Sequence, residues 1–386
     1  MIKTKIEDFL LKKQSTLLCV GPMSKNCVDA CLEISKEKDI LLVLIASRRQ
    51  VDDKFFGGGY VNNWDTENFA KYVFENDKVG NLILARDHGG PWQSDFERKN
   101  KLGLHQAMDS AKLSYKADID AGFKILHIDP SIDIHKKPST DEILLRIYEL
   151  YEYCWSYAKK NNKEIIFEIG TEEQTGSSNS LEELDYTLSN VIDFCRRNKL
   201  PKPTFVVAQT GTRVMETRNV GSFDNPLRIL DEIPAEIQIP RIVDICNKYK
   251  VFLKEHNADY ISDDGLKWHP RLGIHAANIA PEFGVAESIE LLKILEEYGL
   301  KVLADSFLKK SYESRKWNKW MVGDNIASKR QKSIIAGHYV FASSEIKQLK
   351  IEAQKYLLKK GIDLDICLKE AVKVSINRYI KNFRIK

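Results

Sequence analysis

Short apolar runs recur along the chain, separated by longer amphipathic segments. Eight of these runs are predicted to be strands: Thr16–Val20, Ile40–Ala46, Asn81–Arg86, Lys124–Ile128, Glu164–Ile169, Thr204–Ala208, Lys250–Lys254 and Leu272–Ile274. Apolar residues recur at helical spacing in the connections Ser24–Lys38, Thr66–Glu75, Thr140–Lys160, Leu181–Asn198 and Ser288–Tyr298. Eight strands alternating with helix-length connections predict an α/β fold, the (β/α)8 TIM barrel.

The barrel pattern stops near Ser311. We therefore expect residues 1–310 to form the barrel and residues 311–386 to form a C-terminal helical extension. The chain has 386 residues, which exceeds the roughly 250 of a minimal barrel and leaves room for such an extension. The aromatic residues of this extension predict that it packs on the barrel or on a neighbouring subunit, which favours a homo-oligomer.

Composition excludes several classes of protein. The net charge of +4 is small and spread along the chain, so no nucleic-acid partner is expected. No apolar run reaches the roughly 18–20 residues that a membrane span needs, and the first residues lack the apolar centre of a signal peptide. Seven irregularly spaced cysteines do not form a disulfide framework. These features predict a reduced, cytoplasmic protein.

Residues that bind metals or move protons stand at the ends of the predicted strands. Asp87 and His88 close strand three and are followed by Gly89-Gly90. Neighbours on a regular strand point to opposite faces, but a break at the glycines would bring both side chains into one cavity. A histidine that binds a metal, beside an aspartate, suits acid–base chemistry on a substrate oxygen. A helix-capping aspartate and a surface histidine are the alternative.

Strands five, six and seven add further candidates. His256 closes strand seven, about opposite strand three in an eight-stranded ring, and Glu168 and Gln209 end strands five and six. Active sites of TIM barrels lie at the C-terminal ends of the strands, so these residues are predicted to share one cavity. His88, His256 and Gln209 are the expected ligands of a divalent metal, with zinc the expected ion, although glutamine is a poor zinc ligand.

His127 and Asp129 follow the same logic on strand four. Either could be catalytic, since both stand near the end of the strand. His127 could equally lie inside the strand and form a hydrogen bond within the core. The sequence leaves these alternatives open.

The loops after strands seven and eight commonly bind phosphate in barrel enzymes. His275 and Asn278 follow the predicted strand eight, and the small residues between them would let an oxyanion approach the backbone. We expect both to bind the phosphate of a substrate. Arg49 after strand two and Arg330 in the extension are candidate cationic partners, although each could be an ordinary surface arginine.

Two glycine-containing loops are predicted on the same rim. The first, Asp52–Asn63, contains Gly58 within a run of three glycines and is expected to contact the substrate. The second is the polar segment Glu172–Asn179 after strand five. Long loops in compact domains are commonly functional.

Several short motifs resemble those of one family. ARDHGGPW, GFKILHIDPS, EIGTEE, KEHNADY and the FGG stretch after strand two are similar to segments of the class II tagatose-bisphosphate aldolase Z-subunit family. The resemblance runs from about Ser15 to the extension. It implies the barrel of the zinc-dependent ketose-bisphosphate aldolases.

The resemblance also implies roles for individual residues. Asp87 would be the catalytic acid or base, His88 and His256 would be zinc ligands, and Glu168 is our second candidate for acid–base work. The third zinc histidine of class II aldolases follows strand six, but this chain has AQTGTRV there, with Gln209 in its place. That departure affects both the metal site and the mechanism.

The resemblance, together with these residues, implies three possible functions. The leading hypothesis is a metal-dependent class II aldolase that cleaves a ketose phosphate into a dihydroxyacetone-phosphate-like ketone and an aldehyde. A ketose-phosphate 4-epimerase would use the same groups for retro-aldol cleavage and re-addition. The third possibility is a non-catalytic subunit that stabilises a separate aldolase.

Overall fold

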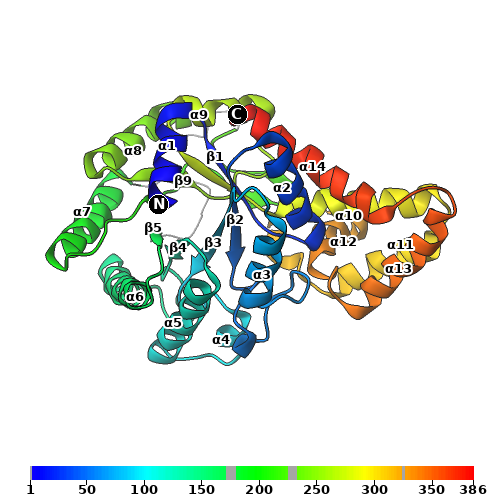
Figure 1. Ribbon diagram of the computed structural model, residues 1–386, viewed down its shortest axis with the longest axis horizontal. Coiled ribbons are helices and arrows are strands. Elements are labelled where there is room, and N and C mark those ends of the chain that lie inside the picture. The colour runs from blue at the N-terminus through cyan, green and yellow to red at the C-terminus, as the bar shows by residue number, and fades with distance from the viewer. Residues whose placement is uncertain (1, 171–179, 225–232, 324–326) are drawn as a thin grey trace.

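The computed structural model describes residues 2–170, 180–224, 233–323 and 327–386 (Figure 1). The predicted loop Glu172–Asn179 lies outside the described residues. No helix in these ranges combines the length and the apolar character that crossing a membrane would require.

Eight parallel strands close into a barrel, which confirms the predicted fold class. Around the ring their order is β1-β10-β9-β6-β5-β4-β3-β2. Two further short strands, β7 (Val214–Met215) and β8 (Arg218–Asn219), pair antiparallel outside the barrel. The barrel strands are β1 (Leu17–Val20), β2 (Leu42–Ser47), β3 (Leu82–Gly89), β4 (Ile125–Ile128), β5 (Ile166–Ile169), β6 (Phe205–Val207), β9 (Phe252–Glu255) and β10 (Ala276–Ile279).

Helices surround the barrel (Figure 1). They are α1 (Ile2–Lys13), α2 (Lys25–Lys38), α3 (Thr66–Asn76), α4 (Asp95–Lys99), α5 (Leu104–Ala121), α6 (Thr140–Lys160), α7 (Leu181–Arg197), α8 (Ala235–Tyr249) and α9 (Asp263–Leu272). The predicted start of α6 is confirmed. Ser139 and Glu142 form a capping box there, in which each side chain bonds to the backbone of the other residue.

The predicted eighth strand is wrong. Leu272 is the last residue of α9, and Gly273 ends that helix at a φ of +82°. The strand itself begins at Ala276. The apolar run Leu272–Ile274 was misassigned because a helix end and a strand start both supply apolar residues, and Gly273 is a typical helix terminator.

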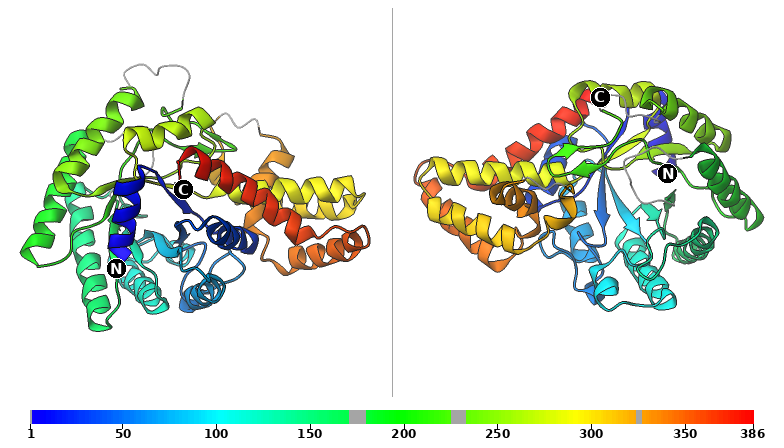
Figure 2. Two further views of the ribbon diagram at one scale, coloured as in Figure 1. Left: turned by 45° about the horizontal axis from the view of Figure 1, so that its top comes forward. Right: turned by 180° about the vertical axis from the view of Figure 1, so that it is seen from behind.

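The C-terminal extension contains five longer helices (Figure 2). They are α10 (Pro281–Glu297), α11 (Lys301–Glu313), α12 (Lys329–Ala336), α13 (Ser344–Leu358) and α14 (Leu364–Asn382). These helices enclose a second hydrophobic core, which already includes Leu291 and Leu292 of α10. The predicted boundary after residue 310 falls inside α11, so a division between the two cores would lie earlier, within α10.

The last helix returns to the barrel. Val372, Ile376 and Tyr379 of α14 belong to the main hydrophobic core rather than the second one. The amide of Thr16, beside β1, donates to the Phe383 carbonyl at 3.1 Å. The extension therefore packs on the barrel of its own chain and is anchored at both of its ends. Three short 3-10 helices, η1 (Lys54–Phe56), η2 (Asn318–Trp320) and η3 (Gly337–Tyr339), lie in the connections.

Candidate functional site

A bulge at the end of β3 turns two neighbouring side chains into the barrel mouth. The register between β3 and β4 shifts between Arg86 and Gly89, and His88 has a φ of +44°. A β-bulge of this kind re-aims side chains that would otherwise alternate between faces. Gly90, two residues after His88, has a φ of +150°, and a Cβ there would stand 2.3 Å from the Asp129 carbonyl oxygen. The predicted break is present, and Asp87 and His88 both line one pocket.

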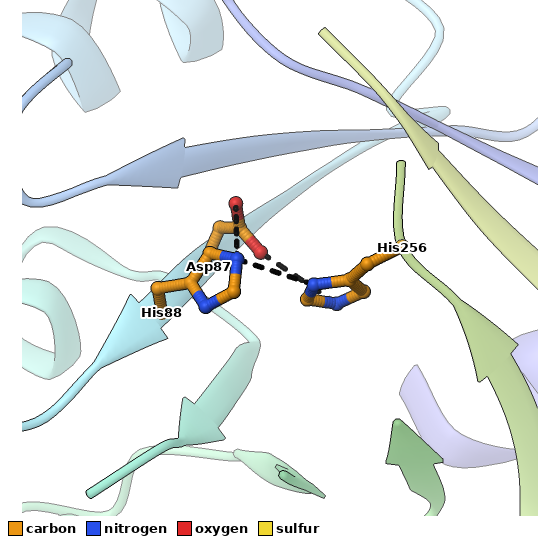
Figure 3. A group of neighbouring side chains, drawn as sticks. All are labelled: Asp87, His88 and His256. Carbon is orange, nitrogen blue, oxygen red and sulfur yellow. Dashed lines mark hydrogen bonds and ion pairs between the residues drawn. The ribbon is translucent and has the colours of Figure 1, made fainter. Parts of the chain in front are cut away.

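Asp87, His88 and His256 point toward one another across the barrel mouth (Figure 3). His88 Nε2 lies 3.2 Å from His256 Nδ1 and 4.0 Å from Asp87 Oδ2. His256 Nε2 lies 3.8 Å from Asp87 Oδ1. Two nitrogens bound to tetrahedral zinc at about 2.0–2.1 Å are roughly 3.4 Å apart, so the two imidazoles have the spacing of a ligand pair.

Asp129 orients His88 from behind. Its Oδ2 lies 2.6 Å from His88 Nδ1, and its Oδ1 accepts hydrogen bonds from the backbone amide and hydroxyl of Ser131. Gln93 Nε2 also donates to Asp129 Oδ2 at 3.1 Å. A carboxylate on the far nitrogen of a metal-binding histidine fixes the tautomer and increases the basicity of the other nitrogen. This arrangement directs His88 Nε2 toward His256.

The electrostatics of this group favour ionised carboxylates. Burial would raise the pKa of Asp87, but His88, His127 and His256 outweigh it and hold this pKa well below its usual range. Burial would lower the pKa of His88, yet Asp87 and Asp129 raise it to about 9. Burial lowers the pKa of His256 to about 4. The ionised carboxylates therefore stabilise positive charge between them: a proton on His88 supplies that charge here, and a bound cation would supply it in the same place.

Glu168 lies deeper in the barrel and is paired with Lys254. Lys254 Nζ donates to Glu168 Oε2 at 2.6 Å, and Glu168 Oε1 lies 3.3 Å from His256 Nε2. Burial would raise the pKa of Glu168, but Lys254 and the neighbouring histidines lower it to about 2. Sequence reasoning missed Lys254. The available signal was a lysine inside an otherwise apolar strand, VFLKEH.

His127 is held in place within the barrel. Its Nδ1 accepts from the His88 backbone amide at 3.1 Å, while its buried Nε2 has no hydrogen-bond partner. A Cβ at position 170, where the chain has Gly170, would lie 2.6 Å from this Nε2. The structure thus agrees with the interpretation of His127 as a strand residue bonded within the core.

The ligand atoms of these residues form three overlapping groups in the described part of the chain. Within each group the atoms lie within 4.8 Å of one another: Asp87, His88 and His256; His88, His127 and Asp129; His127, Glu168 and His256. Each group combines two imidazoles and a carboxylate, but the members of the first group all line a pocket of about 280 Å³, whereas His127, Asp129 and Glu168 do not line it. The first group therefore fits a divalent metal best.

The structure separates the remaining candidates. Asn278 lies on β10, and its Nδ2 donates to Asp87 Oδ1 at 3.0 Å, so it belongs to the site. Gln209 is buried just beyond β6 but is not among the residues that line the pocket. Arg49 lines this pocket and also an adjacent one, whose wall includes Gly58.

Two predicted phosphate ligands lie elsewhere. His275 precedes β10 rather than following strand eight, so it stands at the opposite end of the barrel. There its Nδ1 accepts from the Leu253 amide at 3.1 Å. Arg330 lies on α12 and forms a bidentate ion pair with Glu296 of α10 at 2.7 and 2.9 Å. The incorrect boundary of strand eight displaced His275, and the extension was too irregular in sequence to place Arg330.

Solved structures share this fold. A probable tagatose 6-phosphate kinase from Sinorhizobium meliloti aligns with a TM-score of 0.68 at 16% identity, over 95% of this chain and 100% of that one. Fructuronate-tagaturonate epimerase UxaE from Cohnella laeviribosi aligns at 0.63 and 12%, over 97% and 82%. Fructose-bisphosphate aldolase from Campylobacter jejuni aligns at 0.55 and 12%, over 99% and 93%. At these identities the likeness concerns the fold.

The sequence itself matches a family model. The model for D-tagatose-1,6-bisphosphate aldolase subunit GatZ/KbaZ-like proteins covers residues 6–195. That span contains Asp87, His88 and Glu168, while His256 and the extension lie beyond it. The predicted resemblance is thereby confirmed: residues 6–195 match the model of the GatZ/KbaZ-like family of D-tagatose-1,6-bisphosphate aldolase subunits.

Proposed function

We propose that this protein is a metal-dependent class II aldolase that acts on a ketose phosphate. One observation carries the proposal: His88 Nε2 and His256 Nδ1 face each other at 3.2 Å beside the carboxylate of Asp87. A purely structural subunit has no physical need for this arrangement, because gathering two imidazoles and a carboxylate in a partly buried pocket costs desolvation free energy. The absence of a disulfide among its seven cysteines supports a cytoplasmic location.

His88 and His256 would hold the metal, with zinc as the expected ion. Asp129 contributes by fixing the tautomer of His88, as carboxylates do behind metal-binding histidines. Such a metal supplies Lewis-acid stabilisation of the negative charge that develops on the ketone oxygen during carbon–carbon cleavage. Gln209 is not part of this proposal, because it does not line the pocket.

Asp87 is the acid–base residue in this proposal. Its low pKa keeps it ionised near neutral pH, so its carboxylate can accept the proton from the substrate hydroxyl whose oxygen becomes the aldehyde. Asn278 holds one carboxylate oxygen at 3.0 Å and leaves the other turned toward His88. Glu168 is neutralised by Lys254, so we assign it a positioning role toward His256.

The same residues would serve a ketose-phosphate 4-epimerase, in which the fragments recombine before leaving. The matching family model is described as an aldolase subunit. We therefore propose that the chain associates either with copies of itself or with a separate aldolase chain.

The experiment is a coupled assay for dihydroxyacetone phosphate, run on the full chain with a panel of ketose phosphates. The protein is assayed as purified, after removal of metal by a chelator, and after zinc is restored. Release that is lost with the chelator and regained with zinc supports the aldolase. Bound metal without release, together with interconversion of the 4-epimers on the same panel, identifies the epimerase. A chain that neither binds metal nor turns over any sugar contradicts both catalytic functions.

A further inference from the structure

A second pocket adjoins the proposed metal site. It has a volume of about 360 Å³ and lies between the loop after β2, the short helix α4 and the segment of the extension that contains η2. Arg49, Tyr60, Lys319 and Tyr339 line both pockets. Because these residues are shared, one ligand can extend from the metal site into the second pocket.

Positive charge exceeds negative charge in this second pocket. Its wall includes Arg49, Lys99, Lys316 and Lys319 but only one carboxylate, Asp95, among the described residues. Arg48 also lines it, but this guanidinium is already neutralised by Asp52 and Glu97.

Asp95 is shared between two of the cations. It lies 3.3 Å from Arg49 Nε and 3.1 Å from Lys316 Nζ. No ion pair involves Lys319 in the described part of the chain. Its ammonium instead stands over the rings of Trp320 and Tyr339, at 4.3 and 5.6 Å from their centroids. One carboxylate therefore balances only part of the positive charge.

Lys319 lies among like charges, since Arg49 and Lys316 line the same pocket. A cation held among other cations is destabilised, and a bound dianion would relieve that repulsion.

The usual phosphate site of a barrel is blocked in this chain. That site uses the loops after the seventh and eighth strands of the barrel, which are β9 and β10 here, and the backbone amides of a helix N-terminus. Here the buried carboxylate of Asp259, which lines the metal pocket, accepts hydrogen bonds from the amides of Ala280 and Glu282 at 3.0 and 2.9 Å. The amides at the start of α10 are thus already taken, and a carboxylate occupies the place of an anion.

We propose that the phosphate of the substrate binds in this second pocket, held by Arg49, Lys316 and Lys319. The proposal rests on the proposed function for the position of the sugar. It also gives the extension a direct role, since Lys316 and Lys319 belong to it.

Isothermal titration of the full, metal-loaded chain with inorganic phosphate tests this site. Lys319→Met removes the unpaired ammonium, and Asp95→Asn removes the competing carboxylate. Lys309→Met is the matched control, because Lys309 is an exposed lysine of α11 whose one ion pair among the described residues is with Glu313 at 4.0 Å. We expect Lys319→Met to weaken phosphate binding at least about tenfold. Asp95→Asn should tighten it, and the control should leave it unchanged.

The opposite sign of the two effects guards against misfolding as an explanation, since a damaged protein would not bind phosphate more tightly. Unchanged binding in Lys319→Met, or weaker binding in Asp95→Asn, would overturn the assignment. Metal content, measured on the same samples, separates this proposal from the proposed function. If the variants change phosphate binding as expected but the protein binds no metal, the phosphate site is supported and the metal-dependent aldolase is contradicted. If the protein binds metal and turns over a sugar, but Lys319→Met leaves phosphate binding unchanged, only the phosphate-site proposal is contradicted.

Discussion

Arg86 and Asp87 are neighbours on β3 but lie in two contrasting environments. Arg86 is fully buried, and its guanidinium donates to both oxygens of Asp118 at 2.8 and 2.6 Å and to the carbonyls of Ala46 and Val51. Asp87 faces an open pocket, and nitrogens of three histidines lie 3.8 to 4.0 Å from its carboxylate oxygens. The Arg86–Asp118 ion pair is enclosed by its partners and needs no ligand, whereas Asp87, His88 and His256 line an open pocket that an ion or a substrate can enter. The structural residue Arg86 thus differs from the proposed catalytic residue Asp87 in being fully enclosed by hydrogen-bond partners.

The largest expected effect is in the pocket that Asp87 faces. His256→Ala should abolish stoichiometric metal binding and lower turnover by about three orders of magnitude, because several kcal/mol of transition-state stabilisation are lost. Elemental analysis and the coupled assay measure both. His275→Gln is the control, since this histidine lies at the opposite end of the barrel. Equal metal content in the two variants would contradict the site.

In the buried Arg86–Asp118 ion pair, Arg86→Met should destabilise the fold. It leaves Asp118 as an uncompensated buried charge, so we expect a loss of about 3–5 kcal/mol in the free energy of unfolding. Urea denaturation measures it. The double variant Arg86→Met with Asp118→Leu should recover most of this loss, because replacing both partners by apolar residues removes the unpaired charge. A double variant no more stable than the single one would show that the ion pair is not the cause.

The behaviour of Asp129 links the two environments. It is buried and saturated, yet it bonds to His88 of the open cluster. Asp129→Asn should weaken metal binding by about 10–100-fold, the usual effect of losing a carboxylate behind a metal-binding histidine. A competition titration with a zinc chelator measures the change. Affinity equal to that of the unaltered protein would mean that His88 needs no such support.

The smallest effect concerns the end of the barrel opposite the site. Burial lowers the pKa of His275 from 6.5 to about 4, so this imidazole is neutral in the folded protein. The unfolded chain takes up a proton first as the pH falls, and the free energy of unfolding therefore decreases between pH 6.5 and pH 4. We expect His275→Gln to reduce this decrease by on the order of 1–2 kcal/mol. Unfolding curves measured across this pH range should show a shallower slope for the variant.

The barrel was predictable from the sequence because its strands are buried on both faces and appear as continuous apolar runs. Seven of the eight predicted strands overlap the observed ones, and the start of α6 was marked by Ser139. The eighth failed at Gly273, where local composition does not distinguish a helix end from the start of a strand. The boundary after residue 310 stays a prediction; α10 contributes to both cores, and packing shared between two cores leaves no break in the sequence pattern.

The site was partly predictable for a related reason. Asp87, His88, Glu168 and His256 stand at the ends of apolar strands, and the closure of the barrel brings them together. The pairing of Lys254 with Glu168 and of Asp129 with His88 was not predictable, because the partners lie on different strands and meet only in the folded chain. The same holds for Lys319, whose position depends on how the extension folds back against the loop after β2.

The most direct measurement of the central claim is an anomalous diffraction map at the zinc edge, from crystals of the full chain grown with zinc. The account predicts one strong peak between His88 Nε2 and His256 Nδ1, beside Asp87. A map without a peak there, at full zinc concentration, would contradict the account and leave the barrel mouth without its proposed chemistry.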